Sequence, residues 1–272
     1  MTKQPNITDT LSLARYRTRA QADAMFVHTT AADEVQDRLA MVNKPFRSTT
    51  VVTGFPDFWT NCVSDAQVTE DRDTLDLEPQ TQDAVIHAMA LHWANDPVGQ
   101  LIQCRRALKP DGLFLSVSFG GQTLHELRAC LGQAESELTG GLSPRVVPMA
   151  ELRDLGGLLQ RAGFALPVAD AVPLTVTYND LWALMRDLRA MGETNALSDR
   201  LRRPTRRAIF EKAAALYQEH FGTPDGRITA TFELIFLTGW APDAAQPKAL
   251  RPGSAQQRLA DALGIDEIKL PN

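Results

Sequence analysis

At 272 residues and 44% hydrophobic content, the chain is long enough for one α/β domain with an insertion, or for two small domains. Its net charge of −5 argues against nucleic-acid binding as its main task. Cys62, Cys104 and Cys130 are too few and too scattered for a disulfide framework or a zinc site, which indicates a reducing compartment. Because we find neither a signal-peptide pattern nor an apolar run of about 20 residues, we predict a cytoplasmic protein without a transmembrane helix.

The first elements in chain order are two helices and a strand. Leu11–Ala20 is a short basic helical stretch within an N-terminal basic segment, residues 1–28. Thr30–Asp33 resembles a capping box, so we expect a helix to open there and run to about Val42. Thr49–Thr53 is rich in β-branched residues and predicts the first strand of a sheet.

The middle of the chain predicts a strand, a helix and a second strand. Ala84–Met89 is a short apolar run that suits a buried strand, and Pro97–Leu108 has helical spacing with proline in a tolerated first position. Lys109–Gly112 stops the helix, and Leu113–Phe119 forms the next strand. This order implies a parallel sheet, in which ligands bind at the carboxyl ends of the strands.

The last third predicts another helix and two strands around an insertion. Met149–Ala162 reads as a helix that ends at Gly163. Strands are expected at about Val172–Tyr178 and at Ile228–Trp240. The expected divisions are a core over 29–178, a helical insertion or lid over 179–227 with helices at Asn179–Met191 and Thr205–Phe221, a final core strand over 228–242, and a tail over 243–272 with a helix at Ala255–Leu263.

Three segments together resemble a known family. They are Leu91–Pro97 (LHWANDP), Leu108–Phe114 (LKPDGLF) and Phe119–Arg128 (FGGQTLHELR), and Asp187–Asn195 is also typical. This combination resembles class I S-adenosylmethionine (SAM) methyltransferase-like proteins related to mitochondrial complex I assembly factor 5 and, more distantly, the malonyl-carrier-protein methyltransferase of biotin synthesis. The resemblance implies a Rossmann-like α/β fold with a mostly parallel sheet and a C-terminal antiparallel strand pair. For the assembly-factor branch it implies arginine modification on a respiratory complex I subunit.

The expected cofactor turn departs from the family pattern. Gly54 matches the first glycine of the turn, but Pro56 and Phe58 stand where the second and third glycines belong. Val52 stands where an acidic residue belongs. Proline lacks a backbone donor, and a phenylalanine ring blocks the close approach that glycine permits. The match to a working SAM turn is therefore poor.

The chain is also too short between the first strand and Asp83. Only 29 positions separate Gly54 from Asp83, whereas a helix–strand–helix–strand passage needs about 50 residues. One strand–helix unit is therefore missing after the first strand. If Gln67–Asp71 contains the second strand, Asp71 could hold the cofactor ribose; if it contains the third, Asp71 would match a residue near the adenine.

Candidate site residues follow the predicted strand ends. His92 is the candidate catalytic base because it titrates near neutrality, although it could instead order the loop of Trp93. Asp96 could face substrate or cap the next helix. Gly120 and Gly121 could offer backbone donors to an anion or simply form a tight turn. The predicted substrate-binding set is Trp93, Asp96, Gly120, Gly121, Gln122, Arg128 and Tyr178, and the cofactor-binding set is Gly54, Asp57, Asp71 and Leu91.

Three functional hypotheses remain. The first is a methyltransferase-family protein with a degenerate SAM site that acts by binding a protein partner, by resemblance a respiratory complex I subunit. The second is an active SAM-dependent methyltransferase with an atypical site. The third is arginine hydroxylation, for which the sequence offers no iron-binding triad and no metal site.

Overall fold

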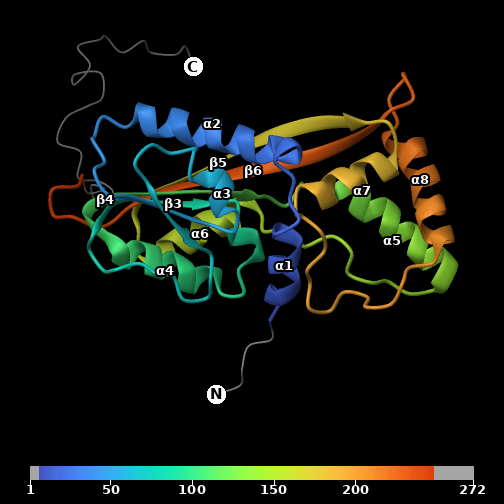
Figure 1. Cartoon of the computed structure of the whole chain (residues 1–272), viewed down its shortest axis with the longest axis horizontal. Helices are drawn as coiled ribbons and strands as arrows, with labels where there is room; N and C mark the ends of the chain where they lie inside the picture. Colours follow the sequence, from blue (N-terminus) through green and yellow to red (C-terminus); the bar gives the residue numbers. More distant parts are fainter. Residues whose placement is uncertain (1–5, 248–272) are drawn as a thin grey trace, which may run out of the picture. The chain divides into compact units, whose positions relative to one another are not determined.

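In the computed structural model, residues 6–247 are described (Figure 1). The described residues up to Pro242 belong to one compact unit, and a second unit begins at Asp243. The helix expected at Ala255–Leu263 lies outside the described residues. The functional features described below all belong to the first unit.

A mixed sheet with the order β2-β1-β3-β4-β6-β5 forms the centre of this unit. The first four strands along the chain pair in parallel, whereas β6 is antiparallel to both β4 and β5. This confirms a Rossmann-like fold, mostly parallel with a C-terminal antiparallel pair. The strands are β1 (Thr49–Thr53), β2 (Gln67–Glu70), β3 (Gln82–Ala88), β4 (Leu108–Phe119), β5 (Ala165–Tyr178) and β6 (Ile228–Trp240).

Helices cover both faces of the sheet because its strands are apolar on both sides (Figure 1). Val51 and Ile86 pack in the core that includes α2 and α5, whereas Val52 and Val85 pack against α4 and α6 on the opposite face. The longer helices are α1 (Thr10–Arg17), α2 (Phe26–Met41), α4 (Pro97–Ala107), α5 (His125–Thr139), α6 (Leu152–Ala162), α7 (Leu181–Ala190) and α8 (Arg207–Phe221). The short turns are α3 (Pro56–Trp59), η1 (Ala22–Ala24) and η2 (Leu91–Trp93).

The place of β2 resolves the open strand assignment. β2 lies beside β1 at the edge of the sheet, which is where a doubly wound fold has its second strand. The described chain then passes from β2 to β3 without another strand or helix. Asp71 therefore follows the second strand, and the missing unit is the third strand with its helix.

Three predicted boundaries were wrong. β4 begins at Leu108, so Lys109–Gly112 lie within the strand instead of forming a separate turn, and a register shift opposite Gln82–Ala84 accommodates them. α2 begins at Phe26, so Thr30 lies inside the helix and its hydroxyl donates to the Phe26 carbonyl instead of capping an end. The start of α2 carries no side-chain cap hydrogen bond, which left no local signal. β5 begins at Ala165, well before the expected Val172, and its prolines are tolerated because it is an edge strand.

The N-terminal segment is tied to the insertion that follows α7. The Asp9 N–H donates to the Ala196 carbonyl at 2.8 Å, and Thr8 forms an antiparallel bridge with Leu197. Arg200 adds an ion pair to Asp9 at 2.9 Å. The N-terminal segment that leads into α1 is therefore bound to residues 196–200, although about 190 positions separate them in the sequence.

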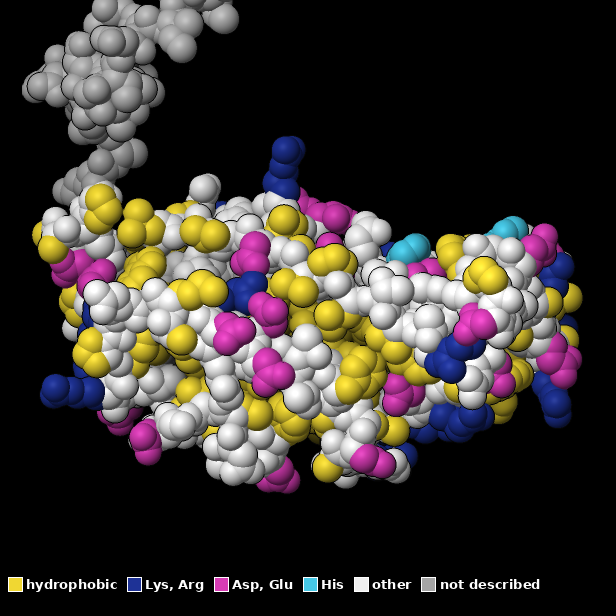
Figure 2. Space-filling view, turned by 90° about the horizontal axis from the view of Figure 1, so that it is seen from above, with side chains coloured by type: hydrophobic (Ala, Val, Ile, Leu, Met, Phe, Trp, Pro, Cys, Tyr) yellow, Lys and Arg dark blue, Asp and Glu magenta, His cyan; other side chains and the backbone are white. Residues whose placement is uncertain are grey.

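The face that carries α2 has a mixed surface. Figure 2 shows acidic, basic and hydrophobic side chains interspersed on it. Arg38 of α2 lies over the Phe236 ring at 3.7 Å and pairs with Asp170 of β5, so part of this mixture is structural.

Candidate functional site

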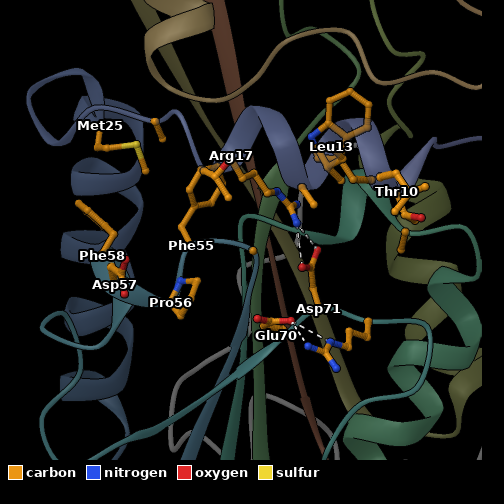
Figure 3. Close-up of a pocket in the computed structure, with 18 of the residues that line it drawn as sticks. Thr10, Leu13, Arg17, Met25, Phe55, Pro56, Asp57, Phe58, Glu70 and Asp71 are labelled. Atoms are coloured by element: carbon orange, nitrogen blue, oxygen red, sulfur yellow. Dashed lines mark hydrogen bonds and ion pairs between the residues drawn. The ribbon is translucent and has the colours of Figure 1, made fainter.

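Two cavities are described below. The larger of the two has a volume of about 1060 Å³ and lies at the carboxyl ends of β1 and β2, beside η2, which follows β3. This is the edge where an open α/β sheet binds its ligand. α1 and the turn after β1 form much of the wall (Figure 3). The polar and aromatic lining residues include Arg17, Gln21, Phe55, Asp57, Phe58, Asn61, Glu70, Asp71, Asp73, Trp93, Asn95 and Gln100.

A buried ion pair crosses this cavity. Arg17 Nη1 donates to both carboxylate oxygens of Asp71, at 2.8 and 2.9 Å. The two side chains are 9% and 11% exposed, so water screens the pair little. Figure 3 shows Arg17 extending from α1 to Asp71 with Phe55 beside it, and the guanidinium carbon lies 5.3 Å from the Phe55 ring centre. The carboxylate in the ribose position is therefore already paired by the chain itself.

The turn after β1 is also filled from within. A Cβ built on Gly54 would overlap the Arg17 guanidinium, so the open face of this glycine lies against Arg17. The Phe55 N–H donates to the Thr53 hydroxyl at 3.2 Å. Pro56, which has no N–H, begins the single turn of α3. Close backbone approach by a cofactor is blocked at the place where the fold normally permits it.

These residues do not fit SAM in the conformation described. Arg17 covers the open face of Gly54 and pairs with Asp71, and these are the two features that would contact SAM. Two further buried donors, Arg17 Nε and Nη2, have no hydrogen-bond partner in the described structure. Arg17 therefore carries unused donor capacity at the centre of the cavity wall.

A smaller cavity of about 250 Å³ lies between β4, α5 and the segment after α7. Trp93 lines both cavities. Its Nε1 donates to Glu193 Oε2 at 2.7 Å, and Glu193 also lines the smaller cavity. The other lining side chains include Phe119, Thr123, Leu127, Arg145, Met149, Arg189, Asn195, Phe210 and Phe232.

Between the cavities lies a buried polar cluster of Arg17, His28, His92 and Glu193. Among the described residues, eight buried side-chain nitrogen or oxygen atoms have no hydrogen-bond partner, and six of these belong to this cluster. Buried polar groups are normally satisfied, so such a concentration points to a ligand or bound water. The six atoms are Arg17 Nε and Nη2, His28 Nε2, His92 Nδ1 and Nε2, and Glu193 Oε1.

The cluster perturbs its own protonation. Burial lowers the pKa of His28 to about 4, with the nearby Glu193 acting in the opposite direction. Burial acts to raise the pKa of Glu193, but the contact with His92 and the charges of His92 and Arg17 outweigh it, so the pKa is lowered. His92 Nε2 lies 3.5 Å from Glu193 Oε2. Glu193 is therefore an ionised carboxylate at neutral pH, while His28 is neutral.

The comparisons with known proteins agree with this architecture. Residues 17–116 match the family model described as a methyltransferase domain. The chain is 39% identical over 205 residues to the zebrafish (Danio rerio) protein named arginine-hydroxylase NDUFAF5, mitochondrial, covering 74% of this chain and 63% of that protein. The chain contains a methyltransferase domain, over residues 17–116.

Other relatives are also similar to the chain. The human arginine-hydroxylase NDUFAF5 is 38% identical and covers 75% of this chain and 59% of its own length. The malonyl-[acyl-carrier protein] O-methyltransferase of Methylovorus sp. is 34% identical, over 72% of this chain and 64% of that protein. The chain thus spans less than two thirds of each of these relatives. Among solved structures, YcgJ of Bacillus subtilis matches with 13% identity and a TM-score of 0.48, covering 78% of this chain and 98% of that one.

The predicted cofactor residues only partly come together. Gly54, Asp57 and Asp71 line the larger cavity. Leu91 is instead buried in the core against α4 and α6 and is not part of the lining. Its position directly after β3 suggested a place in the cofactor site, but its side chain packs in the hydrophobic core.

The residues predicted beyond the strand ends have separate positions. Trp93 lines both cavities, whereas the His92 side chain is only 1% exposed and lines neither. Asp96 caps α4 by accepting a hydrogen bond from the Gly99 N–H at 2.8 Å, which is the helix-capping role given as one of its two alternatives. The Tyr178 hydroxyl donates to Asp187 at 2.7 Å, and burial together with Asp187 raises the pKa of Tyr178.

The glycine segment after β4 lies outside both cavities described above. The Gly120 N–H donates to the Glu233 carbonyl, and the Gln122 N–H donates to the Glu233 carboxylate. A Cβ on Gly121 would overlap the side chain of Glu151. The backbone donors expected for a ligand anion are thus partly used by Glu233, which favours the tight-turn alternative. Arg128 is exposed and donates to the Thr123 carbonyl at 3.3 Å.

Sequence reasoning missed the residues that dominate the site. Arg17 was read only as part of a basic helix, and Glu193 only as part of a family-typical segment. His28 carried no signal at all. The only available signal for Glu193 was its place in the Asp187–Asn195 segment, which the resemblance marked without a role.

Neither a metal-binding cluster nor a membrane-spanning helix occurs among the described residues. Among them, no group of three or more His, Cys, Asp or Glu side chains is arranged to hold a metal ion. The helices within the described part of the chain are all too short or too polar to span a bilayer.

Proposed function

We propose that this methyltransferase-domain protein acts by binding a protein partner and has lost its use of SAM. The observation that carries the proposal is the side chain of Arg17. It covers Gly54 and pairs with Asp71, so it takes both the glycine face and the carboxylate that a SAM molecule would need. Pro56 and the single-turn α3 support the same reading.

The proposed partner is a protein that presents an arginine side chain. Support comes from the relatives, several of which are named arginine-hydroxylase, and from the resemblance to complex I assembly factors. By that resemblance the partner is a subunit of respiratory complex I. We place the protein in a reducing compartment, the cytoplasm, because Cys62, Cys104 and Cys130 are all free thiols.

An active SAM-dependent methyltransferase is the second candidate function. The cavity of about 1060 Å³ favours it, because this volume exceeds that of most ligand sites. Asp71 stands where a ribose carboxylate belongs, and a swing of Arg17 would release it. In that case Arg17 would gate the site, and SAM binding would break the Arg17–Asp71 pair.

Calorimetry with SAM and with S-adenosylhomocysteine separates the two candidates, once extraction has shown that neither co-purifies. We expect no saturable heat at millimolar ligand. Saturable binding at one site, lost in Asp71→Ala and kept in the exposed control Asp37→Ala, would overturn the partner-binding proposal and establish the active enzyme.

The partner side is tested with purified complex I subunits and with a deletion strain. We expect one subunit to be retained on the immobilised protein and complex I to fail to accumulate without the gene. If no subunit binds and complex I is intact in the deletion strain, the respiratory version of the proposal is wrong.

A further inference from the structure

Glu193 lines the smaller cavity, and one of its carboxylate oxygens has no hydrogen-bond partner among the described residues. Glu193 is 5% exposed, and its Oε2 accepts from Trp93 Nε1 at 2.7 Å. Its Oε1 is buried and has no hydrogen-bond partner in the described structure. A buried, ionised carboxylate with one unpaired oxygen costs stability, so its presence points to a role other than packing.

The remaining walls of this cavity suit a flat cation. Trp93, Phe119 and Phe232 present aromatic surface to the same space as Glu193. Aromatic faces attract guanidinium groups. A carboxylate oxygen also accepts charge-assisted hydrogen bonds from guanidinium N–H groups, which are stronger than hydrogen bonds between neutral groups. Phe119 and Phe232 are buried and lie with ring centres 6.1 Å apart, so this surface is already ordered.

Two arginines line this cavity, and neither is paired with Glu193 in the described structure. Arg17, whose charge helps lower the pKa of Glu193, lines the larger cavity and pairs with Asp71. Arg145 is held by Glu135 through two charge-assisted hydrogen bonds, of 2.7 and 2.9 Å. Arg189 is exposed to solvent, so its charge is strongly screened. His92 is the nearest titratable neighbour of Glu193, and its geometry at 3.5 Å does not complete a hydrogen bond.

We infer that Glu193 is the specificity-determining residue for a guanidinium side chain that a partner protein inserts into the smaller cavity. The inference rests on the proposed function, because it names how the partner's arginine is recognised. The relatives' names supply arginine for those proteins; the residue of this chain that reads its charge comes from the geometry of Glu193 and Trp93.

The size of the cavity agrees with one side chain. A volume of about 250 Å³ equals about eight water molecules at ~30 Å³ each, enough for an arginine side chain and too little for a nucleoside cofactor. Glu193 lies on the segment after α7, which is tied to α1 through Ala196 and Leu197. The segment that carries Glu193 is therefore connected to the helix that carries Arg17.

The test uses two small probes on the intact protein. N-acetyl-arginine N-methylamide and its neutral citrulline counterpart are titrated by calorimetry and by nuclear magnetic resonance of the tryptophan indole N–H. We expect saturation by the arginine probe, and at least tenfold weaker binding of the citrulline probe. Tenfold corresponds to about 1.4 kcal/mol. Equal binding of the two probes, or no binding of the arginine probe at about 10 mM, overturns the inference.

The second part of the test uses a variant that removes the charge of Glu193 and keeps the shape of its side chain. Glu193→Gln keeps an acceptor for Trp93 Nε1 but removes the negative charge, and it should weaken the arginine probe at least tenfold without changing the citrulline probe. The exposed Glu219→Gln removes the same charge on α8 and should change neither. Unchanged arginine binding in Glu193→Gln overturns the inference. If Glu193→Gln does not fold, the comparison of the two probes on the wild-type protein still decides.

The two proposals can fail separately. Saturable SAM binding together with Glu193-dependent arginine binding would refute the loss of the cofactor and leave the guanidinium site in place. Absence of SAM binding together with equal probe affinities would leave the partner-binding proposal in place and refute the role of Glu193.

Discussion

Replacing Arg17 by methionine leaves the Asp71 carboxylate buried without its partner. Arg17 Nη1 contacts both Asp71 oxygens at 2.8 and 2.9 Å, and the side chains are 9% and 11% exposed. Removing one member of a buried pair costs about 3 to 5 kcal/mol, because the remaining charge stays desolvated. In a domain of this size, that corresponds to a fall in Tm of about 6 to 20 °C.

The assay is a double-mutant cycle read by urea unfolding. Arg17→Met and Asp71→Asn should each be strongly destabilising, and the double variant should be less destabilised than their sum by about 2 kcal/mol. The exposed ion pair Arg207–Glu211, which has a similar distance of 2.8 Å, is the matched control. Its coupling energy should be only about 0.3 to 0.5 kcal/mol.

Additive losses for Arg17 and Asp71, or losses no larger than those of the control pair, would refute the reasoning. The same Arg17→Met variant also exposes Gly54 and frees Asp71. If the wild-type protein does not bind SAM because of Arg17 alone, this variant should recover measurable SAM binding, and a calorimetric titration of both proteins would show it.

Three further predictions concern single residues. Because burial holds the pKa of His28 at about 4 in the fold against about 6.5 when unfolded, stability falls as pH drops from 6.5 toward 4; His28→Gln should flatten this fall in thermal melts, and an unchanged slope would contradict the assignment. In the native protein a thiol reagent should modify only Cys62, because Cys104 and Cys130 are buried; a ligand in the larger cavity should protect Cys62, and three reactive thiols would refute this. Gly192 has a φ of +83° and packs against neighbouring side chains, so Gly192→Ala should lower the unfolding free energy by more than about 1 kcal/mol, measured in urea.

Much of the fold could be predicted because its signals are local. Thr49–Thr53 and Ile228–Trp240 were predicted with the observed bounds, since β-branched and apolar runs mark buried strands directly. The missing unit followed from chain length alone. The start of α2 could not be predicted, because Met25 makes no side-chain cap and Thr30 imitated one inside the helix.

The site was harder because its decisive contacts span the sequence. Arg17 meets Asp71 across 54 positions, and Trp93 meets Glu193 across 100. Neither pair leaves a periodic pattern that a linear reading can detect. Gly54, Asp71 and Trp93 could be placed because they follow strand ends, where topology fixes the location. Leu91 also follows a strand end, but its side chain turned into the core.

The tie between the N-terminal segment and residues 196–200 has a consequence for how the protein is made. A chain emerging from the ribosome contains α1, β1 and β2 long before Ala196 and Arg200 exist. Until then Asp9 and Thr8 lack the partners that hold α1 over the sheet. The contacts that hold the N-terminal segment in place can therefore form only after residues 196–200 have been made, so this part of the fold assembles late in synthesis.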